Sequence, residues 1–179
     1  MRISRTALDR GWIWATGLGV AAYAILTLLD IRLKSLTGVS TANLEGLASA
    51  AQFRLAFHAW APEPYAARAG FALGFAYLVM PLYGLSFFFS GVIVAERFTP
   101  GKNPFRRWVL LAAMVAAMGA LLDAALKAAE LAMLMDGDDD FLAGIVARLA
   151  NGKLVAVMVG FVLLIGAVTA RFQARKKQA

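Results

Sequence analysis

Four long runs of hydrophobic residues divide this chain, and short polar segments separate them. The runs cover residues 12–29, 69–95, 108–135 and 153–170. At about 1.5 Å per residue, a helix of each length crosses a hydrocarbon core of about 30 Å. Lipid offers backbone groups no water to bind, and no run alternates polar and apolar residues as a barrel strand does. The pattern therefore predicts an all-α polytopic membrane protein, a single domain built as a bundle of four transmembrane helices.

The longest connection between runs, residues 30–68, has a helical pattern of its own. Ser40 or Thr41 is available as an N-cap, and prolines follow as a stop signal. We expect a helix over about 42–60, inside an outer loop of about 40–62, that lies in the membrane interface or folds onto the bundle. Its two apolar stripes consist of Leu44, Leu47, Ala48, Ala51 and Leu55, and of Phe53, Phe57 and Trp60.

The connection between the third and fourth runs begins with five residues of which four are acidic, from Asp136 to Asp140. A calcium-binding loop needs Gly at its sixth position and Glu at its twelfth, and this segment has Phe141 and Ala147 there. We interpret the segment as an acidic turn that ends the third run and caps a second short outer helix.

The cations of the chain are distributed unevenly between the two sides of these four runs. Eleven lie on the side of the termini, and six lie on the other side with seven acids. Because Lys and Arg are enriched in cytoplasmic segments, both termini are expected in the cytoplasm, in a multi-pass protein of the bacterial inner (plasma) membrane. The eleven are Arg2, Arg5, Arg10, Arg97, Lys102, Arg106, Arg107, Arg171, Arg175, Lys176 and Lys177. This bias accounts for the net charge of +7, so nucleic acid is not an expected partner.

The chain offers few residues for metal or redox chemistry. It contains no Cys and one His, which excludes thiolate metal sites, Fe–S clusters, disulfides and paired-His haem ligation within one chain. We therefore expect no cofactor. His58 lies with Arg54 in the outer loop, where both are interpreted as interfacial residues and as candidate ligand contacts, Arg54 for a phosphate.

The third run carries three ionisable residues, Asp123, Lys127 and Glu130, on one helical face. Asp123 lies 15 residues after Trp108, or about 22 Å into the core, so we expect Asp123 alone to be buried while the other two approach the headgroups. A proton relay needs further ionisable groups on both sides of Asp123, and residues 108–122 offer none. Besides that relay, two interpretations stay open. The residues form a structural salt-bridge cluster that Lys34 or Lys153 joins, or they line an outward-facing cavity for a head group or an ion.

Small residues recur every fourth position along the same run. Such a stripe lets another helix approach closely, so we expect it to face protein. The stripe consists of Ala112, Ala116, Ala120, Ala124, Ala128 and Ala132. Similar pairs that can meet it are Gly70 and Gly74, Ala15 and Gly19, and Ala156 and Gly160.

Pro81 lies inside the second run, with Tyr77 and Tyr83 close by. Proline removes one backbone hydrogen bond and frees a carbonyl on the preceding turn. The resulting bend either frames a hydroxyl-lined pocket for a lipid-like ligand or is passive.

Several segments between Leu36 and Gly84 carry a family resemblance, namely T-G-V-S-T-A-N-L-E-G-L, H-A-W and A-Y-L-V-M-P-L-Y-G. Together with Leu122-Asp123 they resemble a group of uncharacterised bacterial four-span integral membrane proteins. The resemblance implies a fold and no activity. Three functions remain: a non-enzymatic accessory subunit that packs against a membrane partner or a second copy, a lipid-binding or lipid-modifying protein with Asp123, Lys127 and Arg54 as contacts, and an oligomeric transporter or channel.

Overall fold

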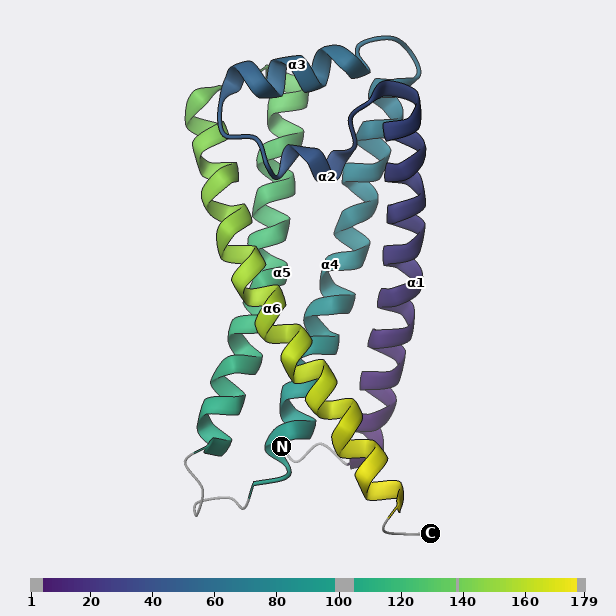
Figure 1. Cartoon of the computed structure of the whole chain (residues 1–179), viewed down its shortest axis with the longest axis vertical. Helices are drawn as coiled ribbons and strands as arrows, with labels where there is room; N and C mark the ends of the chain where they lie inside the picture. The colour runs from purple at the N-terminus through teal and green to yellow at the C-terminus, as the bar shows by residue number, and fades with distance from the viewer. Residues whose placement is uncertain (1–4, 99–104, 138, 177–179) are drawn as a thin grey trace. The chain divides into compact units, whose positions relative to one another are not determined.

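The computed structural model describes residues 5–98, 105–137 and 139–176, and in these it contains six helices and no strand. The helices are α1 (Arg5–Thr37), α2 (Thr41–Leu44), α3 (Ala50–Trp60), α4 (Tyr65–Ala95), α5 (Phe105–Asp136) and α6 (Asp140–Lys176), as Figure 1 shows. Among the charges counted in the sequence, Arg2, Lys102, Asp138 and Lys177 lie outside the described residues, as do the side chains of Arg175 and Lys176.

Helices α1, α4, α5 and α6 are each long and apolar enough to cross a membrane. They carry large hydrophobic side chains that face outward, such as Trp14, Val162 and Ile165, each more than 60% exposed. A water-facing helix would place polar residues there, because exposing apolar surface to water is unfavourable. This arrangement confirms the all-α class and the bundle of four apolar helices.

The chain forms two compact units. The first unit comprises the described parts of residues 1–19, 81–120 and 154–179, and the second comprises residues 20–80 and 121–153.

Small residues bring the helices of the first unit close together. A Cβ atom built on Gly84 of α4 would lie 2.9 Å from the Cβ of Ala120 on α5, and one built on Gly119 of α5 would lie 2.8 Å from that of Ala156 on α6. Such contacts are closer than side chains tolerate, so glycine is required there. In the alanine stripe, Ala116 and Ala120 are buried, Ala112, Ala124 and Ala132 are partly buried, and Ala128 is exposed. The expectation that the stripe faces protein is therefore wrong at Ala128.

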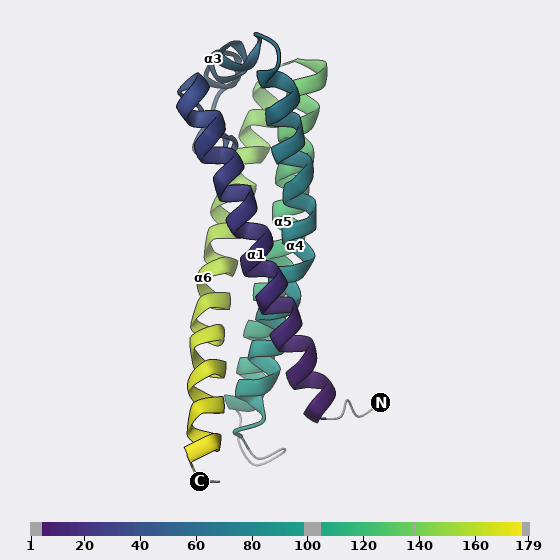
Figure 2. The same cartoon turned by 90° about the vertical axis from the view of Figure 1, so that its right-hand side faces the viewer.

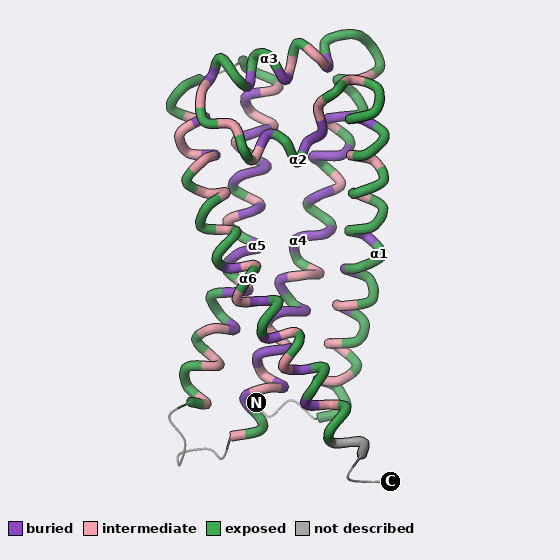
Figure 3. The backbone as a smooth tube through the Cα atoms, in the orientation of Figure 1, coloured by how far each residue is buried: buried purple, intermediate pink, exposed green. Residues whose placement is uncertain are grey.

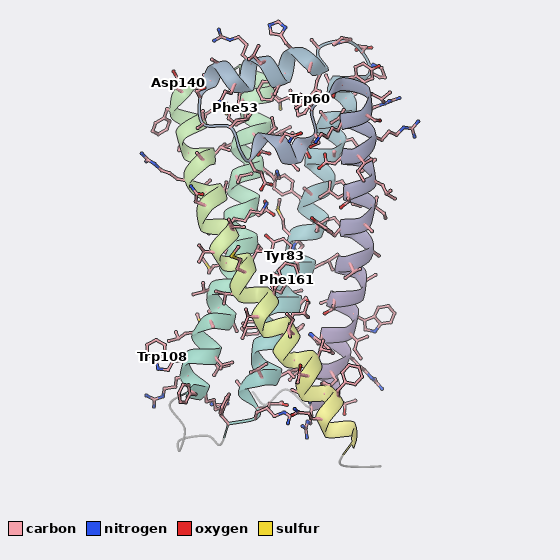
Figure 4. The ribbon with its side chains drawn as sticks, viewed as in Figure 1. Phe53, Trp60, Tyr83, Trp108, Asp140 and Phe161 are labelled. Carbon is pink, nitrogen blue, oxygen red and sulfur yellow. The ribbon has the colours of Figure 1, made fainter. Side chains whose placement is uncertain are left out.

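Aromatic and hydroxyl groups fill the remaining space in this unit. The ring of Phe87 lies 5.6 Å from that of Tyr83 and 5.5 Å from that of Phe161, and Figure 4 labels the two outer members of this set. Trp12 Nε1 of α1 donates a hydrogen bond to Ser90 Oγ of α4 at 2.9 Å. Interhelical hydrogen bonds of this kind stabilise helix packing where hydrophobicity cannot drive association.

Replacing Ala120 with Leu tests this packing. We expect the larger side chain to overpack the contact with Gly84 and to lower the free energy of unfolding by about 1–3 kcal/mol. Leu121→Ala is the control, because Leu121 is 61% exposed and should tolerate truncation. Thermal unfolding in mild detergent measures both, and equal losses in the two variants would contradict a packed interface at Ala120.

In the second unit, the outer loop folds onto the bundle. Figure 1 and Figure 2 both show α3 lying across the ends of the long helices. Leu44, Phe53 and Trp60 are fully buried there, and Figure 3 colours parts of the α2–α3 segment as buried. Trp60 Nε1 donates to the carbonyl of Val39 at 3.1 Å. Of the two expected positions for this segment, the structure has the one packed on the bundle, because the stripe of Phe53, Phe57 and Trp60 packs against the core. The other stripe does so only in part, since its members Ala48, Ala51 and Leu55 are exposed.

The expectation of one helix over 42–60 is wrong, since the segment contains α2 and α3 with a break between them. Gly46 lies in the break, and Ser49 caps α3 by accepting a hydrogen bond from the backbone N–H of Gln52. Ser favours a cap over a helix interior because its side chain competes for backbone groups. The break frees Glu45 from a regular helix face.

The last residue of the acidic segment, Asp140, begins α6 and holds α3 in place. Asp140 Oδ1 accepts a hydrogen bond from the backbone N–H of Ala50 at 2.9 Å, and Figure 4 labels Asp140 at this end of α6. The expected separate short helix after the acidic turn is wrong, because α6 is continuous over 37 residues. Gly152 in a helix costs only about 1 kcal/mol, and burial of Ala143 and Val146 in the core offsets it.

Candidate functional site

The three ionisable residues of α5 are all buried in the second unit. The side chains of Asp123, Lys127 and Glu130 are 10%, 6% and 0% exposed. The expectation that only Asp123 is buried is therefore wrong. Depth along the helix does not decide burial here, because the α2–α3 loop covers this face of α5.

Two further residues complete the site, Glu45 from the break after α2 and Lys153 from α6. Lys127 Nζ lies 2.8 Å from Glu45 Oε1 and 3.0 Å from Glu130 Oε2. Lys153 Nζ lies 2.7 Å from Glu45 Oε1 and 2.8 Å from Asp123 Oδ1. We call these five residues the charge cluster. Each lysine bridges two carboxylates, and Glu45 joins the two lysines.

Local structure explains how Glu45 reaches the cluster. Asp30 Oδ1 accepts hydrogen bonds from the backbone N–H and the hydroxyl of Thr41, at 3.0 and 2.7 Å. This contact holds the start of α2 on α1, and the buried side chain of Leu44 anchors its end. Glu45 follows directly and enters the bundle between α5 and α6.

Sequence reasoning missed Glu45 because it was counted among the outer acids. One signal was present: Glu45 is the only acidic residue from Ile31 to Trp60, in a segment rich in apolar residues. Lys153 was one of two candidates to join the cluster. The other, Lys34, is exposed on α1 and lines a groove under the loop.

The cluster changes the acidity of Glu45. Burial alone would raise the pKa of its carboxyl, but the charges of Lys127 and Lys153, and their hydrogen bonds to it, outweigh burial, so the pKa falls below its ordinary value of 4.5. The five residues carry three carboxylates and two ammonium groups. Within the described residues, Glu130 Oε1 is buried and has no hydrogen-bond partner.

This shift predicts how acid affects stability. A carboxyl whose pKa is lowered by folding contributes stability above its ordinary value, and that contribution is lost as pH falls through the folded pKa. We expect Glu45→Gln to be less stable than the native protein near pH 7, with the difference shrinking below about pH 4.5. Thermal unfolding over a pH series measures it. Glu63→Gln, which removes an exposed carboxylate of the same loop, should show no such convergence, and a pH-independent deficit in Glu45→Gln would contradict the assignment.

The other candidate residues lie apart from the charge cluster. Arg54 and His58 are on the exposed face of α3, opposite the buried Phe53 and Trp60. The structure therefore does not bring Arg54 together with Asp123 and Lys127 as contacts of one ligand pocket. The buried face of α3 is the one that carries the aromatic residues, and Arg54 and His58 lie on its other face.

The tyrosines near Pro81 are engaged with α5. Tyr77 donates a hydrogen bond to the carbonyl of Ala124 at 3.2 Å, in the second unit. Tyr83 donates one to the carbonyl of Gly119 at 3.1 Å, in the first unit. Helix α4 continues through Pro81. These contacts favour the passive bend over a hydroxyl-lined pocket.

The glycine pair expected to meet the alanine stripe does not do so. No atom lies within 4 Å of a Cβ built on Gly70 or Gly74, whereas Gly84 and Gly91 of the same helix lie against α5. The expectation that Gly70 and Gly74 pack on the third apolar run is wrong, because that part of α4 contacts its neighbours through Ala69, Leu73 and other residues of its buried face.

The residues of the charge cluster form ion pairs with one another. Both lysines are committed to carboxylates, and neither of two grooves in this unit, of about 370 and 340 Å³, is lined by a cluster residue. Across the described part of the chain, no group of three His, Cys, Asp or Glu residues is arranged to hold a metal ion.

Comparison with family models, with curated proteins and with solved structures finds no match to this chain.

Proposed function

We propose that this chain is a non-enzymatic integral membrane protein, an accessory subunit that packs against a membrane partner. The observation that carries the proposal is the closed charge cluster. An active site or a transport pathway needs its ionisable groups to be reachable from a cavity. Here the ionisable groups of the helix interior bind one another beneath a packed loop, which favours a structural role for them.

The open glycine pair on α4 supports a partner. Gly70 and Gly74 stand four residues apart with free space beside them, next to the exposed Phe71 and Leu78. Helices associate in lipid through such small-residue faces, because close backbone approach increases van der Waals contact. The expected neighbours are membrane lipids and one protein, either a different chain or a second copy. Nucleic acid is not among them, since the positive charge follows the membrane pattern.

Cross-linking tests this proposal. A photoreactive residue at Leu78 is expected to form a protein adduct of one defined mass in membranes, and one at Val162, an exposed residue of α6, is expected to label lipid alone. Adding Gly74→Leu should remove the protein adduct without lowering stability, because the new side chain meets no neighbour within the chain. Lipid labelling alone from Leu78, or an adduct indifferent to Gly74→Leu, would refute the proposed interface.

We further propose that the protein resides in the bacterial inner membrane with both termini in the cytoplasm. The described cations Arg5, Arg10, Arg106 and Arg107 belong to the more basic side, which supports this orientation. Because the chain has no Cys, single cysteines report accessibility cleanly. An impermeant thiol reagent should label Ala61→Cys in intact spheroplasts and Gln173→Cys only after lysis, and the reverse pattern would overturn the orientation.

A further inference from the structure

A groove of about 340 Å³ lies between α1 and α4 in the second unit. Two arginines line it, Arg32 from α1 and Arg68 from α4. Its remaining lining is apolar, with Leu29 and Leu33 on one side and Phe71 on the other, followed by Pro64 and Ala67. The groove thus joins two cations to an apolar floor.

The two arginines are available to a ligand. Both are exposed, and within the described residues neither forms an ion pair with a carboxylate. The guanidinium carbon of Arg68 lies 5.9 Å from the centre of the Tyr65 ring, a contact that orients the arginine and leaves its N–H donors free to bind an anion. Asp30, the acid nearest to Arg32 in sequence, is occupied by Thr41.

The position of the groove along the helices matches the boundary of a bilayer. Arg32 follows the first apolar run, 12–29, and Arg68 directly precedes the second, 69–95. Cations at the ends of apolar runs lie at headgroup level. Leu29 and Phe71 each lie about one turn from these arginines, on the side of the apolar runs, which places them at the level of the acyl chains.

We propose that this groove binds one anionic phospholipid, with its phosphodiester between Arg32 and Arg68 and an acyl chain along Leu29 and Phe71. Guanidinium groups bind phosphate oxygens through paired, charge-assisted hydrogen bonds. Two positive charges without a carboxylate partner favour a headgroup of net negative charge over a zwitterionic one. The apolar floor favours a lipid over a soluble phosphate, because its side chains offer an acyl chain van der Waals contacts that a soluble phosphate cannot make. The site borders the partner interface proposed above through Phe71, and its two arginines are not part of that interface.

Native mass spectrometry of the delipidated full chain tests the site, with phosphatidylglycerol and phosphatidylcholine of identical acyl chains as probes. We expect phosphatidylglycerol to bind at least about tenfold more tightly, and Arg32→Gln with Arg68→Gln to weaken its binding by at least about tenfold. The control, Lys34→Gln with Arg148→Gln, removes two exposed cations from the same end of the helices outside this groove. It should change affinity by less than about threefold. Because all four residues are exposed, folding is checked by an unchanged melting temperature.

Three results would overturn the proposal. Equal losses in the arginine variant and the control would indicate general charge attraction rather than a site. Equal binding of the two lipids would show that the groove does not select an anionic headgroup. Competition by glycerol phosphate at the concentration of the lipid would show a phosphate site with no contribution from the acyl chain.

Discussion

Replacing Lys127 with Met is expected to lower the free energy of unfolding by about 3–5 kcal/mol. Lys127 binds Glu45 and Glu130, and its side chain is 6% exposed. Without it, the cluster holds three carboxylates and one ammonium group beneath the outer loop. Charges left without a partner in a low-dielectric interior are strongly destabilising, and removing one member of a pair costs more than the pair itself contributes. Thermal unfolding in mild detergent is the measurement.

A second substitution distinguishes charge from packing in this result. Adding Glu130→Gln to Lys127→Met restores the original charge balance, and we expect it to recover a large part of the loss. Lys34→Met is the matched control, because Lys34 is exposed on α1, and its effect should stay within about 0.5 kcal/mol. If the double variant were no more stable than Lys127→Met, the loss would arise from packing and the role of the ion pairs would be wrong.

Truncating Trp60 to Ala is expected to have a similar effect, a loss of about 3–5 kcal/mol. Trp60, the last residue of α3, is fully buried. Its ring lies 5.9 Å from that of Phe57, and its indole N–H donates a hydrogen bond to the carbonyl of Val39. The variant loses apolar burial, leaves a cavity and leaves the Val39 carbonyl without this donor. Since the α2–α3 loop carries Glu45, detachment of α3 should also expose the charge cluster, and faster labelling of a cysteine at Ala56, a buried residue of α3, would report the detachment.

Leu55→Ala is the matched control for Trp60, because it lies on the same helix and is 72% exposed. We expect its melting temperature to stay close to that of the native protein. Comparable losses of stability in Leu55→Ala and Trp60→Ala would contradict the packing of α3 on the bundle through its aromatic face. They would indicate that α3 lies in the membrane interface instead.

Much of the fold follows from local patterns that the sequence displays directly. The lengths of the apolar runs identified α1, α4, α5 and α6, because the bilayer requires a minimum length of continuous apolar helix. The spacing of Asp123, Lys127 and Glu130 placed them on one face of α5, because side chains three and four residues apart are neighbours on any helix. Both features depend on residues close together in the chain, which is why they were predictable.

Only the tertiary structure decided which distant residues meet. Glu45 belongs to a loop that sequence alone left free to lie in the interface, and its ion pairs with Lys127 and Lys153 span 82 and 108 residues. The same holds for the four glycines of α4, which look alike in sequence although Gly84 and Gly91 pack on α5 while Gly70 and Gly74 remain open. Helical periodicity defines the faces of a helix and says nothing about which other helix covers each face. Which helix covers each face depends on packing between segments far apart in the chain. In this protein that packing covers the polar face of α5 and closes the charge cluster.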